Sequence, residues 1–241
     1  MNVISVGDIH GRPYWKLINP DLFDRIVFNG DYMDSYIFSN DETLQNIYEI
    51  VEFKKMYPEK VVLLLGNHDV QYMWSYREFG CTGFRDTMYD DVHILLNDNR
   101  DLFRVAHQEG KTIWTHAGIS KGWLKYNQKT IDENAKKFGT EQLVDTLNCI
   151  MHTSDNKILH QVSSIRGGVY RDGGITWADR RETMNNYLDG YHQIVGHTPI
   201  DRITRFGDEN GSIRYIDVQR NADKDGADAY RLDELFYVCE L

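Results

Sequence analysis

The sequence predicts an α/β fold in which parallel strands are joined by helical crossovers. Short runs of β-branched and aliphatic residues each end at a glycine, at residues 3–6 before Gly7, 25–29 before Gly30 and 61–65 before Gly66. Between the last two runs, residues 41–56 place apolar side chains near helical spacing behind Asp41, a favourable helix cap. Strand, helix and strand in this order form a βαβ unit. Because right-handed crossovers bring the carboxyl ends of parallel strands to one edge, we expect the glycine turns to be neighbours.

The second half of the chain predicts a hairpin, a helical insert and further strands. Residues 102–107 and 112–115 flank a glycine-containing turn and predict a hairpin whose second strand runs into His116. Residues 121–162 are rich in charge, and their apolar residues recur at i, i+4 and i+7, so we predict a helical insert within a single domain of residues 1–241. A mixed helical stretch is expected at residues 72–96, and strands at residues 193–195, 203–206, 213–218 and 235–238.

Composition excludes several classes of protein. Of the 241 residues, 27 are Lys or Arg and 37 are Asp or Glu, and this net charge of −10 argues against broad nucleic-acid binding. The three cysteines show no CxxC spacing, so we expect reduced thiols in a cytoplasmic protein rather than a disulfide framework or a zinc knuckle. No apolar run is long enough to predict a membrane span. Residues 221–226 begin like a calcium loop, but Leu232 replaces the required glutamate, and a polar hairpin loop is predicted instead.

Polar residues of the types that can bind metal ions follow five of the predicted strands. The segments at these strand ends are Gly7-Asp8-Ile9-His10-Gly11, Gly30-Asp31-Tyr32-Met33-Asp34, Gly66-Asn67-His68-Asp69, Thr115-His116-Ala117-Gly118 and Gly196-His197-Thr198. Their mixed oxygen and nitrogen donors suit manganese, iron or zinc better than calcium or copper. One ion would leave ligands unused, whereas two ions about 3.5–4 Å apart, bridged by a carboxylate, would use all of them. Such a pair activates water and holds a phosphate for in-line attack.

In this order the blocks GDIHG, GDYMD, GNHD, THAG and VGHT resemble the signature blocks of the calcineurin-like metallophosphoesterase superfamily. The form is similar to the serine/threonine phosphoprotein phosphatase branch, which has GDxVD, HGGLS and LLWSD where this chain has GDYMD, HAGIS and ITWAD. The blocks cover residues 7–198. The resemblance implies a two-sheet β-sandwich flanked by helices, a four-layer α/β/β/α fold, with the site at the carboxyl ends of the strands.

The resemblance also implies a ligand set for two divalent metal ions, for which we expect manganese, with iron or zinc as alternatives. Asp31 would bridge the two ions, and the implied metal ligands are Asp8, His10, Asp31, Asn67, His116 and His197. His68 would be the general acid, held protonated by Asp34. Arg166 and Asn67 would contact the substrate phosphate, because a guanidinium suits a tetrahedral oxyanion.

Two departures from the branch bear on the substrate. Ser35 and Leu65 stand where the protein phosphatases carry arginines, so the site would grip phosphate less tightly or recruit Arg12, Arg77 or Arg171. We expect a metal-dependent phosphomonoesterase that acts on a phosphoprotein or a nucleotide-like small molecule. The alternatives are a symmetrical diadenosine tetraphosphatase, a phosphodiesterase, and a non-catalytic scaffold. Pro199 argues against the phosphodiesterases, which usually show a GHxH pair.

Overall fold

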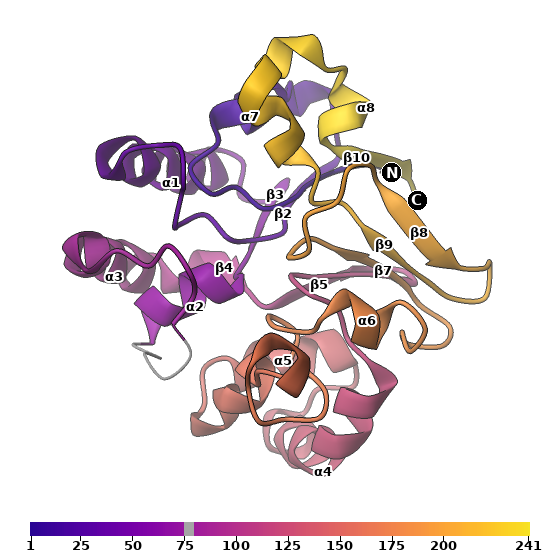
Figure 1. The fold of residues 1–241 in the computed structure, drawn as a ribbon. Helices are drawn as coiled ribbons and strands as arrows, with labels where there is room; N and C mark the ends of the chain where they lie inside the picture. The colour runs from indigo at the N-terminus through magenta and orange to yellow at the C-terminus, as the bar shows by residue number, and fades with distance from the viewer. Residues whose placement is uncertain (75–79) are drawn as a thin grey trace.

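A computed structural model describes residues 1–74 and 80–241, and its strands form two five-stranded sheets (Figure 1). Arg77 lies outside the described residues. The first sheet has the spatial order β10 (Tyr237–Glu240), β1 (Asn2–Val6), β2 (Arg25–Phe28), β3 (Val61–Leu64) and β4 (Phe103–Arg104). β1 to β4 are parallel to one another, and β10 is antiparallel to β1. With α1 (Asn40–Met56) between β2 and β3, this arrangement is the predicted βαβ unit.

The second sheet has parallel strands at its centre and antiparallel strands at both edges. Its spatial order is β5 (Ala106–Glu109), β6 (Thr112–Thr115), β7 (His192–Val195), β9 (Ser212–Tyr215) and β8 (Thr204–Gly207). β6, β7 and β9 are parallel, and β5 and β8 are antiparallel to their neighbours. The carboxyl ends of β6, β7 and β9 therefore meet at one edge, as those of β1 to β3 do in the first sheet.

The two sheets pack face to face around a buried apolar cluster. Side chains alternate between the faces of a strand, so Val3, Val27 and Val62 point inward from the first sheet. They meet Trp114 and Ile194 of the second sheet, and the Trp114 indole also donates a hydrogen bond of 2.9 Å to Ser5 Oγ. This interlock confirms the predicted two-sheet sandwich.

Helices cover the outer faces of the sandwich. α1 lies over the first sheet, where its Ile47, Ile50 and Val51 join the cluster formed by the alternate residues of β1 and β2. The helix begins after Ser39, which forms a capping box with Glu42, so the predicted cap at Asp41 was wrong by two residues. α2 (Asn67–Met73) and α3 (Tyr89–Asp98) follow, and the predicted insert contains α4 (Lys121–Phe138) and α5 (Leu143–Ile150). Within the described residues, no helix is both long and apolar enough to cross a lipid bilayer.

Several predicted boundaries were wrong. Residues 102–107 are not one strand, because the chain leaves the first sheet after β4 and enters the second at β5. The Asn148 side chain of α5 occupies this crossing, where its oxygen accepts hydrogen bonds from the backbone N–H groups of Val105 and Ala106. Near the C-terminus, α8 (Leu232–Leu235) precedes β10, and α7 (Ala222–Asp225) replaces the predicted hairpin loop. A further short helix, α6 (Arg180–Thr183), precedes β7.

Candidate metal centre

Backbone conformation singles out the strand-end loops. Within the described residues, the non-glycine residues with positive φ are His10 (43°), Asp31 (53°), Asp34 (63°) and His197 (64°). All four are residues that the sequence analysis assigned to the site. Such conformations are costly for residues with a Cβ and persist where the surrounding structure enforces them, often at functional sites. Glycines give these loops room, because a Cβ at Gly66 would collide with the Asp31 carboxylate and one at Gly196 with that of Asp8.

The loops after β1 and β2 bring Asp8, His10 and Asp31 together. His10 Nε2 lies 3.7 Å from Asp31 Oδ2 and 4.0 Å from Asp8 Oδ2. His10 Nδ1 is 2.7 Å from the carbonyl oxygen of Met33, which can only accept, so the proton lies on Nδ1 and the lone pair of Nε2 faces the carboxylates. Burial lowers the pKa of His10 to about 4, which keeps the ring neutral.

The loops after β3, β6 and β7 bring Asn67, His116 and His197 to the same Asp31 carboxylate. His116 Nε2 lies 3.0 Å from Asn67 Oδ1, 3.1 Å from His197 Nδ1 and 3.3 Å from Asp31 Oδ2. His116 Nδ1 is 2.7 Å from the carbonyl oxygen of Asn29, which fixes its proton on the side away from the cluster. The six predicted ligands thus form two groups that share Asp31.

The donor set fits divalent cations. Neighbouring carboxylate oxygens, amide oxygen and imidazole nitrogens lie 3.0 to 4.0 Å apart. The rings of His10 and His116 are turned so that a lone pair faces the cluster. Such oxygen and nitrogen donors are the ligands of manganese, iron and zinc. Two sets of residues offer ligand atoms close enough to surround one ion each, namely His10, Asp31 and His68, and Asp31, His116 and His197. The first set includes His68, which the sequence analysis did not count among the ligands.

His68 and Asp34 form a hydrogen-bonded pair beside the cluster. His68 Nδ1 lies 2.7 Å from Asp34 Oδ2, and the His68 ring packs edge-on against that of His10 at 4.9 Å between centroids. The Asp34 carboxylate is buried and also accepts hydrogen bonds from Gln71 and from the Tyr72 hydroxyl. Burial alone lowers the pKa of His68, but the Asp31 and Asp34 carboxylates outweigh burial and raise that pKa above its usual value.

Arg166 lies at the second-sheet side of the cluster. Its guanidinium forms an ion pair of 2.7 Å with Asp179 and donates a hydrogen bond of 3.1 Å to Thr198 Oγ1, one residue after His197. Arg12, one of the suggested replacements, makes a two-pronged ion pair with Asp223 of α7 at 2.7 and 2.8 Å.

The remaining candidate arginine and the two positions without arginine lie in different surroundings. Arg171, the remaining candidate among the described residues, is 95% exposed and has Asp172 as an ion-pair partner. Leu65 is wholly buried in the apolar core. Ser35 is buried as well, and its hydroxyl accepts hydrogen bonds from the backbone N–H groups of Ile37 and Phe38. At the two positions that carry arginine in the protein phosphatases, Leu65 therefore packs in the core and Ser35 stabilises a turn.

Sequence reasoning missed three supporting side chains. Asp69, within the GNHD block, accepts hydrogen bonds from the backbone N–H groups of Asp31, Tyr32 and Gly66 at 2.8 Å, and burial beside Asp31 raises its pKa to about 7. Its place in a quoted block was a usable signal.

Asp217 and Cys81 gave weaker signals. Asp217, two residues after β9, is hydrogen-bonded to Asp8, and burial raises the pKa of both carboxyls, that of Asp217 to about 6. The prediction had placed this residue inside a strand. The buried Cys81 Sγ lies 3.1 Å from Asn67 Nδ2 and so receives the amide proton, which turns the amide oxygen toward His116. No motif marks this cysteine.

Comparison with proteins of known sequence gives relatives of two substrate classes. The symmetrical bis(5'-nucleosyl)-tetraphosphatase of Erwinia tasmaniensis is 30% identical over 132 residues, which are 51% of this chain and 46% of that protein. The serine/threonine-protein phosphatase 4 catalytic subunit of Kluyveromyces lactis is 27% identical over 150 residues, 54% of this chain and 43% of that protein. The chain therefore spans about half the length of these curated relatives.

Solved structures support the fold. The cold-active protein-tyrosine phosphatase of a psychrophilic Shewanella species matches with a TM-score of 0.55 at 17% identity, over 93% of this chain and 73% of that one. A protein serine/threonine phosphatase from Saccharomyces cerevisiae matches with a TM-score of 0.50 at 11% identity, over 99% and 79% of the two chains. At these identities the likeness concerns the fold alone.

A family profile decides the assignment. The profile described as calcineurin-like phosphoesterase matches residues 1–210, which include all five strand-end blocks and both sheets except β9 and β10. This match confirms the resemblance that the five blocks indicated. The protein belongs to the calcineurin-like phosphoesterase family.

Proposed function

We propose that this protein hydrolyses phosphate monoesters with two divalent metal ions, manganese in the first place, held by the six strand-end ligands. The observation that carries the proposal is the convergence of the other five ligand side chains around the Asp31 carboxylate. When bound, two such ions activate water and neutralise charge on the phosphate. Asp8 and His10 would hold one ion, Asn67, His116 and His197 the other, and Asp31 both.

The remaining residues would act on the phosphate and the leaving group. Arg166, fixed by Asp179 and Thr198, can donate to the oxygens of a phosphate bound beside His197. Asn67 contributes its amide oxygen to the cluster and has one further amide proton for the phosphate. His68, whose Nδ1–H donates to Asp34, can give its Nε2 proton to the departing alkoxide. No covalent intermediate with the protein is needed.

The substrate is the finer part of the proposal. We propose a small phosphomonoester, because the site has Arg166 for a phosphate but lacks the two arginines that Ser35 and Leu65 replace. A phosphorylated protein and a nucleotide-like small molecule remain the candidate sources of this group. The second candidate function is symmetrical dinucleoside tetraphosphate hydrolysis, which the 30% identity to the Erwinia tasmaniensis protein favours. We also propose a cytoplasmic location, supported by three free cysteines.

The test is a substrate panel with metal-stripped protein. para-Nitrophenyl phosphate, a phosphoserine peptide, bis-para-nitrophenyl phosphate and diadenosine tetraphosphate are assayed with manganese, zinc or magnesium added back. We expect manganese-dependent turnover of the monoesters. Preferred cleavage of diadenosine tetraphosphate would select the second candidate function, and the absence of bound metal would contradict the proposal altogether.

A matched pair of variants tests the role of Arg166. Arg166 and Arg181 both pair with Asp179, at 2.7 and 2.8 Å, but only Arg166 also donates to Thr198. Arg166→Ala should raise the KM for a phosphomonoester about 10-fold or more, since a hydrogen bond to a charged group contributes about 1.5–3 kcal/mol. Arg181→Ala, the control, should leave the KM nearly unchanged. Equal effects of the two substitutions would assign Arg166 a structural role only.

A further inference from the structure

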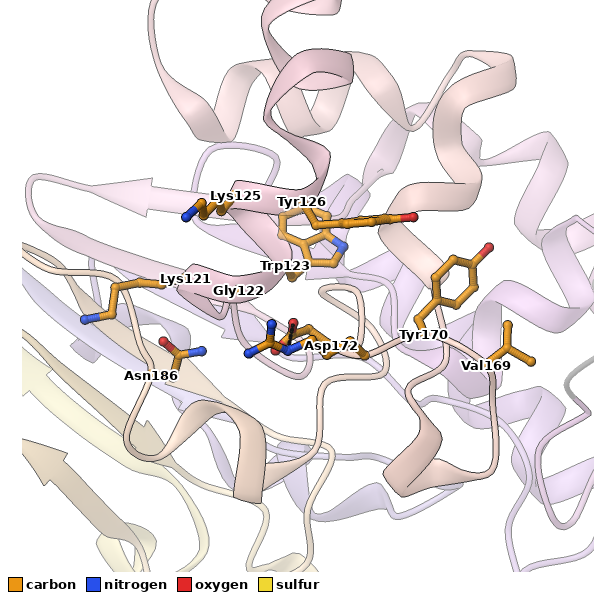
Figure 2. Close-up of a pocket in the computed structure, with 10 residues that line it drawn as sticks. Lys121, Gly122, Trp123, Lys125, Tyr126, Val169, Tyr170, Asp172 and Asn186 are labelled. Carbon is orange, nitrogen blue, oxygen red and sulfur yellow. Dashed lines mark ion pairs between the residues drawn. The ribbon is translucent and has the colours of Figure 1, made fainter.

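A cavity of about 750 Å³ lies between the first turns of α4 and the loop of residues 163–172 (Figure 2). Its volume falls within the range of about 300–1,000 Å³ that is usual for small-molecule sites. The loop begins with a short 3₁₀ turn and is closed by hydrogen bonds of 2.8 Å from Ser164 N to the Tyr170 carbonyl and from Gly168 N to that of Ser163. The site is separate from the metal ligands, none of which lines it.

The lining of this cavity combines rings with positive charges. Tyr126 of α4 is 73% exposed and Val169 of the loop is 80% exposed, so apolar surface is offered to an occupant. Figure 2 shows Lys121 and Lys125 at one end of the cavity, and Tyr126 and Tyr170 at the other. An occupant that matches both ends would carry a planar ring at one end and negative charge at the other.

The charges favour an anion although the whole chain carries −10. Lys121, Lys125 and Arg171 line the cavity against one acidic residue, Asp172. Lys121 and Lys125 are four residues apart on one face of α4, where like charges repel. The first turn of α4 contains no acidic residue, so the helix itself does not balance Lys121. Lys121 pairs with the 81% exposed Asp189, a partner that water screens.

We propose that this cavity binds a nucleotide, with the base against Tyr126 and Tyr170 and the phosphates at Lys121, Lys125 and Arg171. Stacking on tyrosine tolerates any base, and the basic side chains select for the phosphates. The bound nucleotide would touch the same loop that carries Arg166, since Arg166 and Tyr170 lie four residues apart on it. Binding here does not depend on the metal centre.

The test measures ADP binding by calorimetry to full-length protein in the presence of a chelator, so that neither bound metal nor hydrolysis contributes. We expect saturable binding of ADP and much weaker binding of adenosine or inorganic phosphate alone. Tyr126→Ala and Lys125→Ala should each weaken ADP binding about 10-fold. The controls are Tyr48→Ala on α1, which removes a ring that is 52% exposed, and Lys129→Ala on α4, which is 88% exposed and does not line the cavity.

Two outcomes would overturn the proposal: no binding of ADP at millimolar concentration, or ADP binding that is unchanged in both cavity variants. The proposed function is tested separately, because ADP binding in chelator, together with no phosphatase activity when manganese is added back, would support the cavity while contradicting the proposed function. Conversely, manganese-dependent hydrolysis without ADP binding in chelator would leave the phosphatase standing and remove the nucleotide site.

Discussion

The two halves of the metal centre differ in how far they open to solvent. The first-sheet half presents His10, with 17% of its side chain exposed, and the neighbouring His68, with 13% exposed. In the second-sheet half, His116 is wholly buried and His197 is 7% exposed. We call the first the open half and the second the buried half, and Asp31 joins them. From this difference we expect the leaving group to depart on the first-sheet side, beside His68, whereas the second-sheet side anchors the centre and holds the phosphate through Arg166.

The halves also differ in how their histidines are fixed. His10 hydrogen-bonds to the carbonyl of Met33, which lies in a loop, whereas His116 hydrogen-bonds to the carbonyl of Asn29, at the end of β2. The Asn29 amide in turn donates to the carbonyls of Thr115 and Ile194 at 3.2 Å and so links the two sheets. The buried half is therefore tied to the core of the sandwich, and the open half to the surface loops.

Removing one histidine from each half gives the largest expected effects. His10→Asn should release one ion and keep the buried one, so that bound metal falls from two ions to one per chain. His116→Asn should release the buried ion and also destabilise the fold, because the buried Asn29 carbonyl loses its hydrogen-bond donor. Both variants should lose at least about 10²–10³-fold in kcat. Metal content after dialysis and thermal unfolding distinguish them, and equal metal loss with equal stability would contradict the division into halves.

His68→Asn tests the open half alone. If His68 protonates the leaving group, kcat for an alkyl phosphate should fall about 10²–10⁴-fold. The loss should be much smaller for para-nitrophenyl phosphate, whose phenolate departs without help. Bound metal should stay at two ions per chain, and His152→Asn, at an exposed histidine, is the control. Equal losses with both substrates would show that His68 acts on the phosphate or the metal instead.

Cys81→Ala tests the support of the buried half. The substitution removes the acceptor of the Asn67 amide proton, so the amide can rotate away from His116. Metal affinity should fall about 10–100-fold, as it does when a partner behind a ligand is removed. Cys81→Ser retains an acceptor and should restore most of the affinity, and Cys149→Ala is the control. Unchanged manganese affinity in Cys81→Ala would make this cysteine a packing residue only.

The predictability of the site follows the same division between strands and loops. Asp8, Asp31 and His116 were predictable because each lies within three residues of the end of a buried strand, and parallel pairing brings such positions together. The partners of the Arg12 guanidinium and the Asp8 carboxyl were not, because Asp223 and Asp217 lie about 200 residues away in sequence. The break between β4 and β5 was also hidden, since it depends on a side chain of α5.

Acid should destabilise the folded protein through His160. His160 is buried, its Nδ1 is 2.9 Å from Thr176 Oγ1, and burial lowers its pKa to about 3. The folded state keeps His160 neutral, whereas the unfolded chain binds a proton below about pH 6.5. Its contribution to stability is therefore complete above pH 6.5 and is lost as the pH falls toward 3, at about 1.4 kcal/mol per pH unit.

Urea unfolding of wild type and His160→Gln between pH 7.5 and 5 measures this contribution. The variant should lose less of its unfolding free energy across that range than the wild type, whatever its stability at neutral pH. His152→Gln removes an exposed histidine and should change the pH dependence less than His160→Gln does. Because Thr176 belongs to the segment whose Ile175 carbonyl accepts the Ala117 backbone N–H, loss of His160 packing would reach the loop that carries His116. Identical pH dependence in wild type and His160→Gln would mean that groups other than His160 cause the loss of stability in acid.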